Sequence, residues 1–522
     1  MADRVAPVPV PVLSRTRFVG KIGAAVALVA LADILFFDQE LGWTLGLFAA
    51  AWVALGALVL RSTVAPRARQ VALLAAALFA AVLVDDPNPL AWCLFWLANA
   101  SAALLGRVSF DDAARWMVRL GAHGLYGLSS PFWDARRLAR SRAGRGGGIV
   151  ALASLVALPL VGGTIFTLLF ANANPVIAAV FATIEIPGLG RALLHLLLWA
   201  FVLVLVWPTL RPRTFALVAR IVGADPVRLP ELPRATLTLS LLTFNAIFLV
   251  QNLLDIVFLW RGAALPAGVT MAEYAHRGAY ALIATALLAG LFVLVALRPG
   301  GAGARSPMVR RLVVLWVAQN LLLVASSVLR TLDYIAAYSL TELRIAALAW
   351  MALVACGLVL ICWRMLAGRT ATWLINANAA AAAAVLAAAS VVDLGAAAAT
   401  WNVDHARRAE RLDLCYLDRL GASALLPVIA LERRAAGPRL RDQARYLRIG
   451  KLARLTREQA DWHSWSWRGA RRLAAARAAV ATMPATLRPA PHGRGCGGTA
   501  ATPPPVVVAP RASATLTKGG ER

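Results

Sequence analysis

Long apolar stretches recur from near the N-terminus to about residue 394, and they constrain the fold more than any other feature of the chain. About eleven of them approach the roughly 20 residues that a helix needs to cross a bilayer. Of the 522 residues, 60% are hydrophobic and 15% are charged, which is more apolar surface than a soluble domain of this length can bury. The sequence therefore predicts an all-α fold, a polytopic helical bundle with lipid as its solvent.

The apolar stretches divide the chain into segments. The predicted spans are 19–37, 43–60, 70–84, 89–106, 147–171, 191–210, 236–260, 275–297, 309–331, 343–366 and 370–394. The predicted segments are a basic leader (1–18), N-terminal transmembrane helices (19–106), a basic amphipathic cytoplasmic connector (107–146), a main transmembrane core (147–394), a helical amphipathic tail (395–483) and a disordered tail (484–522).

Charged residues beside the spans orient the bundle. Arg15, Arg17 and Lys21 precede the first span, whereas Asp38 and Glu40 follow it. Positive residues collect on the cytoplasmic side of membrane proteins, so the N-terminus is predicted to be cytoplasmic. An odd number of spans then places the C-terminal tail on the extracytoplasmic side. The many arginines of that tail oppose this assignment, but long segments cross a membrane largely regardless of charge.

Two segments outside the spans are predicted to form amphipathic helices. In the connector, Asp111 and Asp112 signal a helix start. That helix either lies on the inner membrane surface or packs under the bundle as an ordinary connector, and both interpretations are open. In the tail, Trp462, Trp465 and Trp467 stand beside several arginines, a mixture that suits contact with anionic lipid headgroups.

Composition and motifs exclude several function classes. The net charge of +27 lies mainly in short loops and in the tail, and no nucleic-acid-binding fold accompanies it. The predicted partner is therefore the lipid bilayer with its anionic headgroups, and not nucleic acid; a partner membrane protein is a further candidate. The five cysteines form no CxxC pair, so we expect neither a metal site nor a disulfide framework. No catalytic or cofactor-binding motif stands in a usable context, so no catalytic residue and no cofactor is predicted.

Ionisable residues at membrane depth are costly and are therefore candidates for function. Asp33, His195 and Asp255 each lie about one helical turn from the predicted outer end of a span. A denser set of polar side chains lies in two predicted outer loops. It consists of Glu273, Tyr274, His276, Arg277, Arg330, Asp333, Tyr334, Tyr338, Glu342 and Arg344.

The two outer loops have two possible roles. The arginines could pair with Glu273, Asp333 or Glu342 and lock the helix ends at the headgroup level. The same groups could instead form one contiguous site for a ligand, an ion or a partner protein. We expect the loops to meet in space in either case.

Several of these residues also carry a family resemblance, which is most specific from about residue 235 to 432. The chain resembles a bacterial family catalogued as domain of unknown function 4173, related to 4153. The resemblance rests on Tyr274-Ala275-His276-Arg277-Gly278, Arg330-Thr331-Leu332-Asp333-Tyr334, Tyr338 to Arg344, Trp401-Asn402-Val403 and Leu414 to Leu431. It implies a multi-pass protein of the bacterial cytoplasmic (inner) membrane and no particular activity. Ser339 stands where that family prefers Gly, and Ala279 replaces a bulkier residue.

Three functions are compatible with the sequence. The first is a membrane scaffold or sensor whose outer-face Tyr/Arg/acid cluster binds a ligand or partner. The second is a transporter or channel for a small solute or ion, favoured by the intramembrane polar residues but not by any visible inverted repeat. The third is a membrane enzyme that acts on a lipid-linked substrate, for which no motif supplies a nucleophile or a metal.

Overall fold

The computed structural model describes residues 15–60, 67–142, 188–213, 233–260, 306–405 and 412–500, together with isolated positions within 159–174 and at 288 and 292. Across these residues the regular structure is helical, and the β pairing is an isolated bridge between Arg494 and Ala500. The chain forms two compact units. The first comprises residues 1–394 and 455–474, and the second comprises 395–454 and 475–522.

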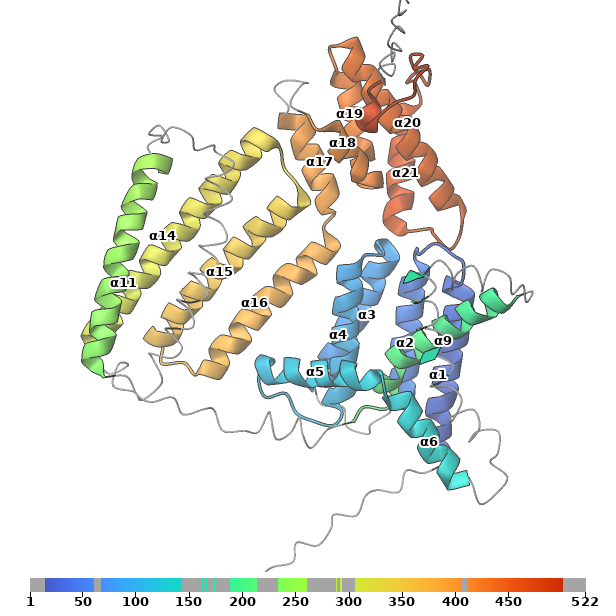
Figure 1. The fold of residues 1–522 in the computed structure, drawn as a ribbon, viewed down its shortest axis with the longest axis horizontal. Coiled ribbons are helices and arrows are strands. Elements are labelled where there is room, and N and C mark those ends of the chain that lie inside the picture. Colours follow the sequence, from blue (N-terminus) through green and yellow to red (C-terminus); the bar gives the residue numbers. More distant parts are fainter. Residues whose placement is uncertain are drawn as a thin grey trace, which may run out of the picture. The chain divides into compact units, whose positions relative to one another are not determined.

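Five helices form one bundle in the first unit: α1 (Arg15–Phe36), α2 (Thr44–Val59), α3 (Arg67–Asp85), α4 (Pro89–Leu105) and α9 (Leu189–Leu210) (Figure 1). Aromatic side chains fill its centre. The Trp52 ring packs against Phe48 and Phe95 and is fully buried, and its indole N–H donates to Thr209 Oγ1 at 2.8 Å. A Cβ on Gly46 would lie 2.7 Å from the carbonyl oxygen of Ala80, so this glycine lets α2 and α3 approach closely.

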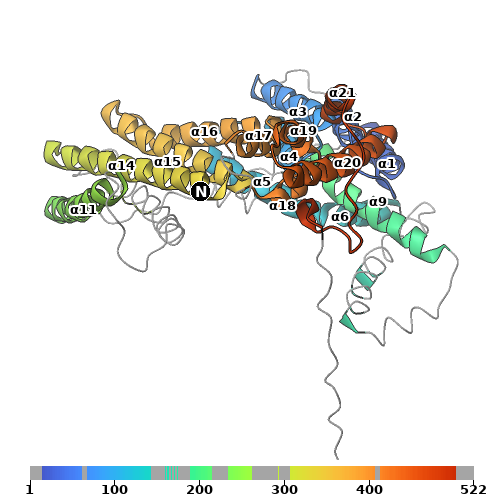
Figure 2. The same cartoon turned by 90° about the horizontal axis from the view of Figure 1, so that it is seen from above.

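A second group of helices in this unit consists of α11 (Arg234–Asp255) with a π-helical extension (Ile256–Trp260), α14 (Pro307–Tyr338), α15 (Glu342–Leu366) and α16 (Ala371–Val391). The last three lie side by side (Figure 1, Figure 2). Short connections join them, so α15 runs antiparallel to both α14 and α16. Thr341 and Thr370 cap α15 and α16 by accepting a hydrogen bond from the backbone N–H three residues on.

The predicted spans that fall on described residues coincide with helices. Seven of the described helices are long and apolar enough to cross a membrane: α1, α3, α9, α11, α14, α15 and α16. Two shorter apolar helices, α2 and α4, occupy the predicted spans 43–60 and 89–106. The predicted spans 147–171 and 275–297 lie almost wholly outside the described residues. The structure thus agrees with a multi-pass membrane protein, while the number of eleven spans stays a prediction.

The connector contains two helices, α5 (Ala113–Gly127) and α6 (Ser130–Arg142). The Asp112 carboxylate caps α5 by accepting the backbone N–H of Arg115 at 2.8 Å, as expected from the acidic pair at this position. Trp116 and Leu120 bury one face of α5 against α4. The helix therefore packs on α4, and both interpretations of its place at the membrane stay predictions.

The described residues of the tail form several short and medium-length helices. Its helices are α17 (Leu394–His405), α18 (Leu414–Arg419), α19 (Leu425–Arg434), α20 (Pro438–Ala460) and α21 (Trp467–Val480). In the second unit, the buried carboxylate of Glu432 accepts hydrogen bonds from Arg445 and Arg448 at 2.9 and 2.6 Å. This pairing lets two helices rich in arginine pack together.

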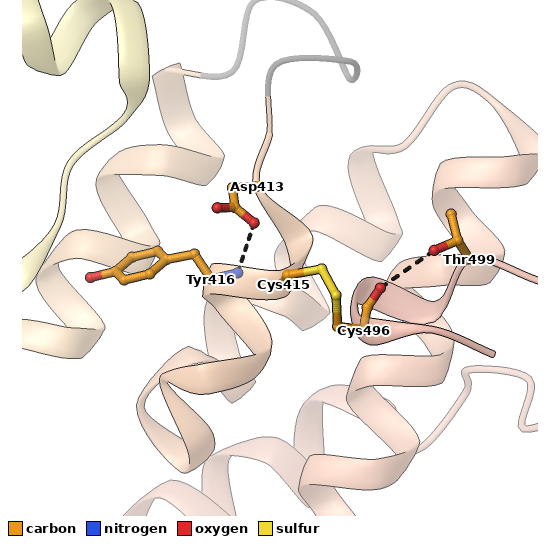
Figure 3. The surroundings of a disulfide bond; sticks show 5 residues. All are labelled: Asp413, Cys415, Tyr416, Cys496 and Thr499. Carbon is orange, nitrogen blue, oxygen red and sulfur yellow. Dashed lines mark hydrogen bonds between the residues drawn. A yellow bond between two sulfur atoms is a disulfide. The ribbon is translucent and has the colours of Figure 1, made fainter. Parts of the chain in front are cut away.

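A disulfide bond between Cys415 and Cys496 joins residues 81 positions apart, where we expected none (Figure 3). The two glycines after Cys496 fit closely against the helices. A Cβ on Gly497 would lie 2.8 Å from Leu414 Cβ, and one on Gly498 would lie 2.9 Å from a ring carbon of Tyr446. Both glycines have positive φ angles, of 72° and 76°.

Residues 484–500 belong to a segment that we expected to be disordered. The structure describes them as turns that end in the disulfide-linked 3₁₀ helix Cys496–Gly498, whereas 501–522 lie outside the described residues. The disulfide bond and close backbone contacts hold this segment, which has no amphipathic face of its own. Hydrophobic periodicity therefore gave no sign of it.

We expect Cys496→Ser to release residues 484–500 from the second unit. Loss of a native disulfide typically costs about 2–5 kcal/mol. Trypsin should then cleave after Arg494 faster than in the unmodified protein. Cys362→Ser, which removes a free thiol, is the matched control and should leave the cleavage rate unchanged. Equal rates in the two variants would contradict the prediction.

Candidate functional site

The polar residues at membrane depth meet in two separate pairs. The first joins α1 to α9. His195 Nδ1 lies 2.6 Å from Asp33 Oδ1, and the indole N–H of Trp199 donates to the same oxygen at 2.8 Å. The Phe37 ring stacks on the imidazole with ring centres 3.4 Å apart. The Asp33 and His195 side chains are 26% and 29% exposed, so this pair is accessible from the surface of the bundle.

This arrangement fixes the orientation of the imidazole. An ionised Asp33 carboxylate accepts a hydrogen bond from the Nδ1–H group of His195. The Nε2 atom of His195 is then left to accept or donate another hydrogen bond. The pair can therefore exchange a proton or bind a polar group that approaches Nε2. Within the described residues, no group of three or more His, Cys, Asp or Glu side chains could hold a metal ion.

The second pair joins α11 to α14. The Arg330 guanidinium forms an ion pair with the Asp255 carboxylate, and Gln251 Nε2 donates to the same carboxylate at 3.1 Å. Side-chain exposure is 8% for Arg330 and 1% for Asp255. A buried charge without a partner is strongly unfavourable at this depth, so each side chain stabilises the other.

We expected Glu273, Asp333 or Glu342 as the acid for Arg330, and the structure pairs it with Asp255. Asp333 is exposed, although it lies only three residues from Arg330 on α14. The cause is the packing of α11 along α14, which brings the last turn of α11 beside Arg330. Glu273, Tyr274, His276 and Arg277 lie outside the described residues, so the contact between the two outer loops stays a prediction.

Amide side chains continue the contact between α11 and α14 toward the middle of the helices. Asn245 Nδ2 donates to the Leu312 carbonyl at 3.1 Å, and Asn252 Nδ2 donates to the Gln319 carbonyl at 3.3 Å. Both contacts join residues 67 positions apart, so the two helices run parallel. Gln319 Nε2 also donates to Asn245 Oδ1 at 2.7 Å. We call this row of polar contacts the α11/α14 seam.

Arg344 closes the C-terminal end of α14. Its guanidinium donates to the Tyr338 carbonyl at 2.7 Å and also to the Ser339 carbonyl. Its central carbon lies 4.3 Å from the ring centre of Tyr334, which in turn contacts the Tyr338 ring at 4.7 Å. A cation at the C-terminal end of a helix satisfies carbonyls that lack an intrahelical partner. Glu342 lies in the first turn of α15, where a negative charge is favourable.

Segment 461–472 belongs to the first unit. Its arginines bind carboxylates near the ends of α3 and α16 in the same unit. Arg468 donates to Asp85 at 2.8 Å and to Asp86 at 2.9 Å, and Arg471 donates to Asp85 at 2.8 Å. Arg472 pairs with the Asp393 carboxylate beyond α16. Burial raises the pKa of Asp86, and the positive charge of Arg468 opposes that shift. The contact of this segment with lipid headgroups, expected from its composition, stays a prediction.

The same segment contacts the connection between α1 and α2. The backbone N–H of Trp43 donates to the Trp465 carbonyl at 2.7 Å, and its indole N–H donates to the Trp462 carbonyl at 2.7 Å. A Cβ on Gly42 would lie 2.2 Å from the His463 carbonyl oxygen, so only glycine fits there. No sequence pattern signalled these contacts, because they join residues more than 400 positions apart.

Residues 25–431 match the family described as Domain of unknown function (DUF4153). The chain belongs to this family. The match includes both intramembrane pairs, the α11/α14 seam and Arg344, and it ends before α20. The resemblance to domain of unknown function 4173 is corrected accordingly, since that family is related but different. No curated protein and no solved structure matches the chain significantly.

Arg330→Ala and Arg344→Ala should differ in their effect on stability. The first leaves the buried Asp255 carboxylate without its counter-charge, which costs about 3–5 kcal/mol. The second removes hydrogen bonds to helix-end carbonyls that remain near water, which costs about 1 kcal/mol. Thermal unfolding in detergent, followed by tryptophan fluorescence, measures both. An equal loss of stability in the two variants would contradict the burial of the Arg330–Asp255 ion pair.

Ser339→Gly should stabilise the protein. Ser339 has φ 71° and ψ 167°, a conformation that favours glycine, and the side chain costs about 1–3 kcal/mol there. Part of this cost should be recovered as a higher unfolding temperature. Ser339→Ala keeps the Cβ and should bring no gain, which makes it the matched control. A drop in the unfolding temperature of the glycine variant would refute the assignment of strain.

Proposed function

We propose that this member of the family is a multi-pass scaffold or sensor of the bacterial cytoplasmic membrane. In this proposal the N-terminus lies inside and the C-terminal tail, from residue 395 onward, lies outside. The observation that carries the location is the Cys415–Cys496 disulfide. Disulfides form and persist in oxidising compartments and are rare in the cytoplasm. A tail stabilised in this way suits the extracytoplasmic side.

The contacts of segment 461–472 support the same side. This segment binds the connection between α1 and α2 through Trp43, and the connection between α3 and α4 through Asp85 and Asp86. Both connections carry acidic residues and no Lys or Arg, whereas the connection between α2 and α3 contains Arg61. By the distribution of positive charge, the two acidic connections are extracytoplasmic. Charge distribution and redox chemistry thus both favour the extracytoplasmic side for the C-terminal tail.

The outer face supplies the groups that a sensor or scaffold needs to bind a ligand or partner. Tyr338 is exposed beside Arg344, and His195 presents Nε2 at the surface of the bundle. Trp462 and Trp467 are about half exposed, and we propose that they rest among anionic headgroups. Because Arg330 and Arg344 already bind groups of this chain, the proposed ligand is recognised mainly through Tyr338 at the end of α14.

A transporter or channel is the second candidate, and the α11/α14 seam favours it. Polar side chains that run from mid-helix to a helix end are expected of a solute or ion pathway. Reconstitution into liposomes separates the two candidates. Solute leak or uptake above that of protein-free liposomes would favour transport over a scaffold or sensor.

Reporter fusions to the full chain test the proposed topology. A reporter that is active only outside the cytoplasm should be active after Arg522, and a reporter that is active only in the cytoplasm should be active before Met1. The opposite reporter at each end is the control and should be silent. Activity of the cytoplasmic reporter after Arg522 would place the disulfide in a reducing compartment and overturn the proposed location.

A further inference from the structure

Arg364, in the last turn of α15, is almost fully buried and lacks a counter-charge. The residue is 6% exposed, and its guanidinium makes no hydrogen bond or ion pair with the residues that the structure describes. Its nitrogens are not completely enclosed, so a small group can reach them. Arg330, at similar burial, has the Asp255 carboxylate as its partner. A covered cation is costly unless it is paired, so Arg364 requires an anion that the described helices do not supply.

The packing of α15 on α16 brings Arg364 to the start of α16. A Cβ on Gly357 would lie 2.9 Å from Asn378 Oδ1, so these two positions face each other across the contact. Arg364 is seven residues after Gly357, which is two helical turns and nearly the same face of α15. Because the helices are antiparallel, the matching position on α16 is seven residues before Asn378. That position is Ala371, the first residue of α16.

The acidic side chains that approach α16 from α5 are already paired. A backbone N–H at the start of α5 donates to Asn376 Oδ1 at 2.8 Å. Asn376 is two residues from the position that faces α15, so it lies on the opposite side of α16. Asp111 and Asp112 precede this contact, and they bind Arg119 at 2.6 Å and Arg115 at 3.4 Å. These carboxylates therefore serve α5 and do not neutralise the cation on α15.

The start of α16 offers backbone donors at the same level. Thr370 Oγ1 accepts the backbone N–H of Trp373 at 3.1 Å, which caps the helix. Within the described structure, the backbone N–H groups of Ala371 and Thr372 donate no hydrogen bond. Residues 366–370 and Thr372 are exposed, so the turn is open to a ligand. The N-terminal end of a helix carries a partial positive charge and binds anions through such free N–H groups.

The surroundings of the turn indicate which anion fits. Arginine binds phosphate through two parallel N–H donors, and helix N-termini bind phosphate through backbone N–H groups. Trp363 and Leu366 are exposed beside the turn, and tryptophan is enriched at the headgroup level of a bilayer. In the proposed topology this end of α15 is cytoplasmic, where membranes carry anionic lipids.

We propose that the turn between α15 and α16 binds a phosphate group, of an anionic lipid or of a soluble phosphate, between the Arg364 guanidinium and the first N–H groups of α16. The turn lies at the opposite end of α15 from Arg344 and Tyr338. The inference therefore goes beyond the proposed function, which places its ligand at that other end.

Titration of the full-length protein in non-ionic detergent tests the proposal. The probes are dioctanoyl phosphatidylglycerol, which is a soluble anionic lipid, and sodium phosphate. Dioctanoyl glycerol is the matched lipid without phosphate, and sodium chloride keeps the ionic strength constant. A ligand that binds the folded state raises the unfolding temperature as its concentration rises above Kd, so thermal unfolding followed by tryptophan fluorescence reports binding. We expect a saturable rise with a phosphate-bearing probe and none with dioctanoyl glycerol.

Three variants locate the site. Arg364→Gln should raise Kd on the order of tenfold or more, because hydrogen bonds between charged groups are lost. Ala371→Pro removes one N–H donor and should raise Kd severalfold. Proline is favoured at the first position of a helix, and Thr370 already has the extended φ of −72° and ψ of 163° that proline requires before it. Arg234→Gln removes the same charge from an exposed side chain at the start of α11 and should leave Kd unchanged.

The outcomes separate the two sources of phosphate from diffuse attraction by charge. A response to the lipid that both Arg364→Gln and Ala371→Pro weaken supports a lipid phosphate, and the same pattern with sodium phosphate supports a soluble one. Equal effects of Arg234→Gln and Arg364→Gln would overturn the proposal, as would the lack of a saturable response to both probes. If Arg364→Gln fails to fold, Ala371→Pro decides, and an unchanged Kd in that variant would overturn the proposal.

Discussion

Hydrocarbon offers no hydrogen bonds, so every polar group at membrane depth must find its partner within the protein. This constraint explains how the helices of the first unit associate. Asp33 meets His195 between α1 and α9, and Asp255 meets Arg330 between α11 and α14. Each pair lies near helix ends, where long side chains can also reach the interface. Apolar packing fills the rest of each contact, but it leaves the register of two apolar helices weakly defined, and the polar pairs specify it.

The second unit, which we call the C-terminal module, combines many arginines with an apolar core that includes Leu417, Val428 and Leu447. Acidic side chains that are far apart in the sequence bring the arginines together, as Glu432 does for Arg445 and Arg448. The disulfide then holds residues that have no amphipathic face of their own. Covalent and ionic contacts therefore add to the apolar core of this module.

Sequence reasoning located most of what depends on local pattern. Apolar length predicted the helices, the acidic pair near residue 112 predicted the start of α5, and the departure at Ser339 marked a backbone position that favours glycine. It missed what depends on distant partners. The parallel packing of α11 along α14 selected Asp255 for Arg330, and no spacing rule pairs two cysteines 81 residues apart. Proximity in sequence pointed to Asp333, which lies about one turn beyond Arg330 on α14 and is exposed, whereas Arg330 is buried against Asp255.

The two intramembrane pairs differ in what they can do. Arg330 keeps its charge under all physiological conditions and is almost fully covered together with Asp255, so this pair cannot respond to the solution without breaking. Asp33 and His195 are about a quarter exposed, and the imidazole keeps a second nitrogen that can gain or lose a partner while the contact with Asp33 persists. The contact between α1 and α9 can therefore change its partners through His195, whereas the contact between α11 and α14 is held by a closed ion pair.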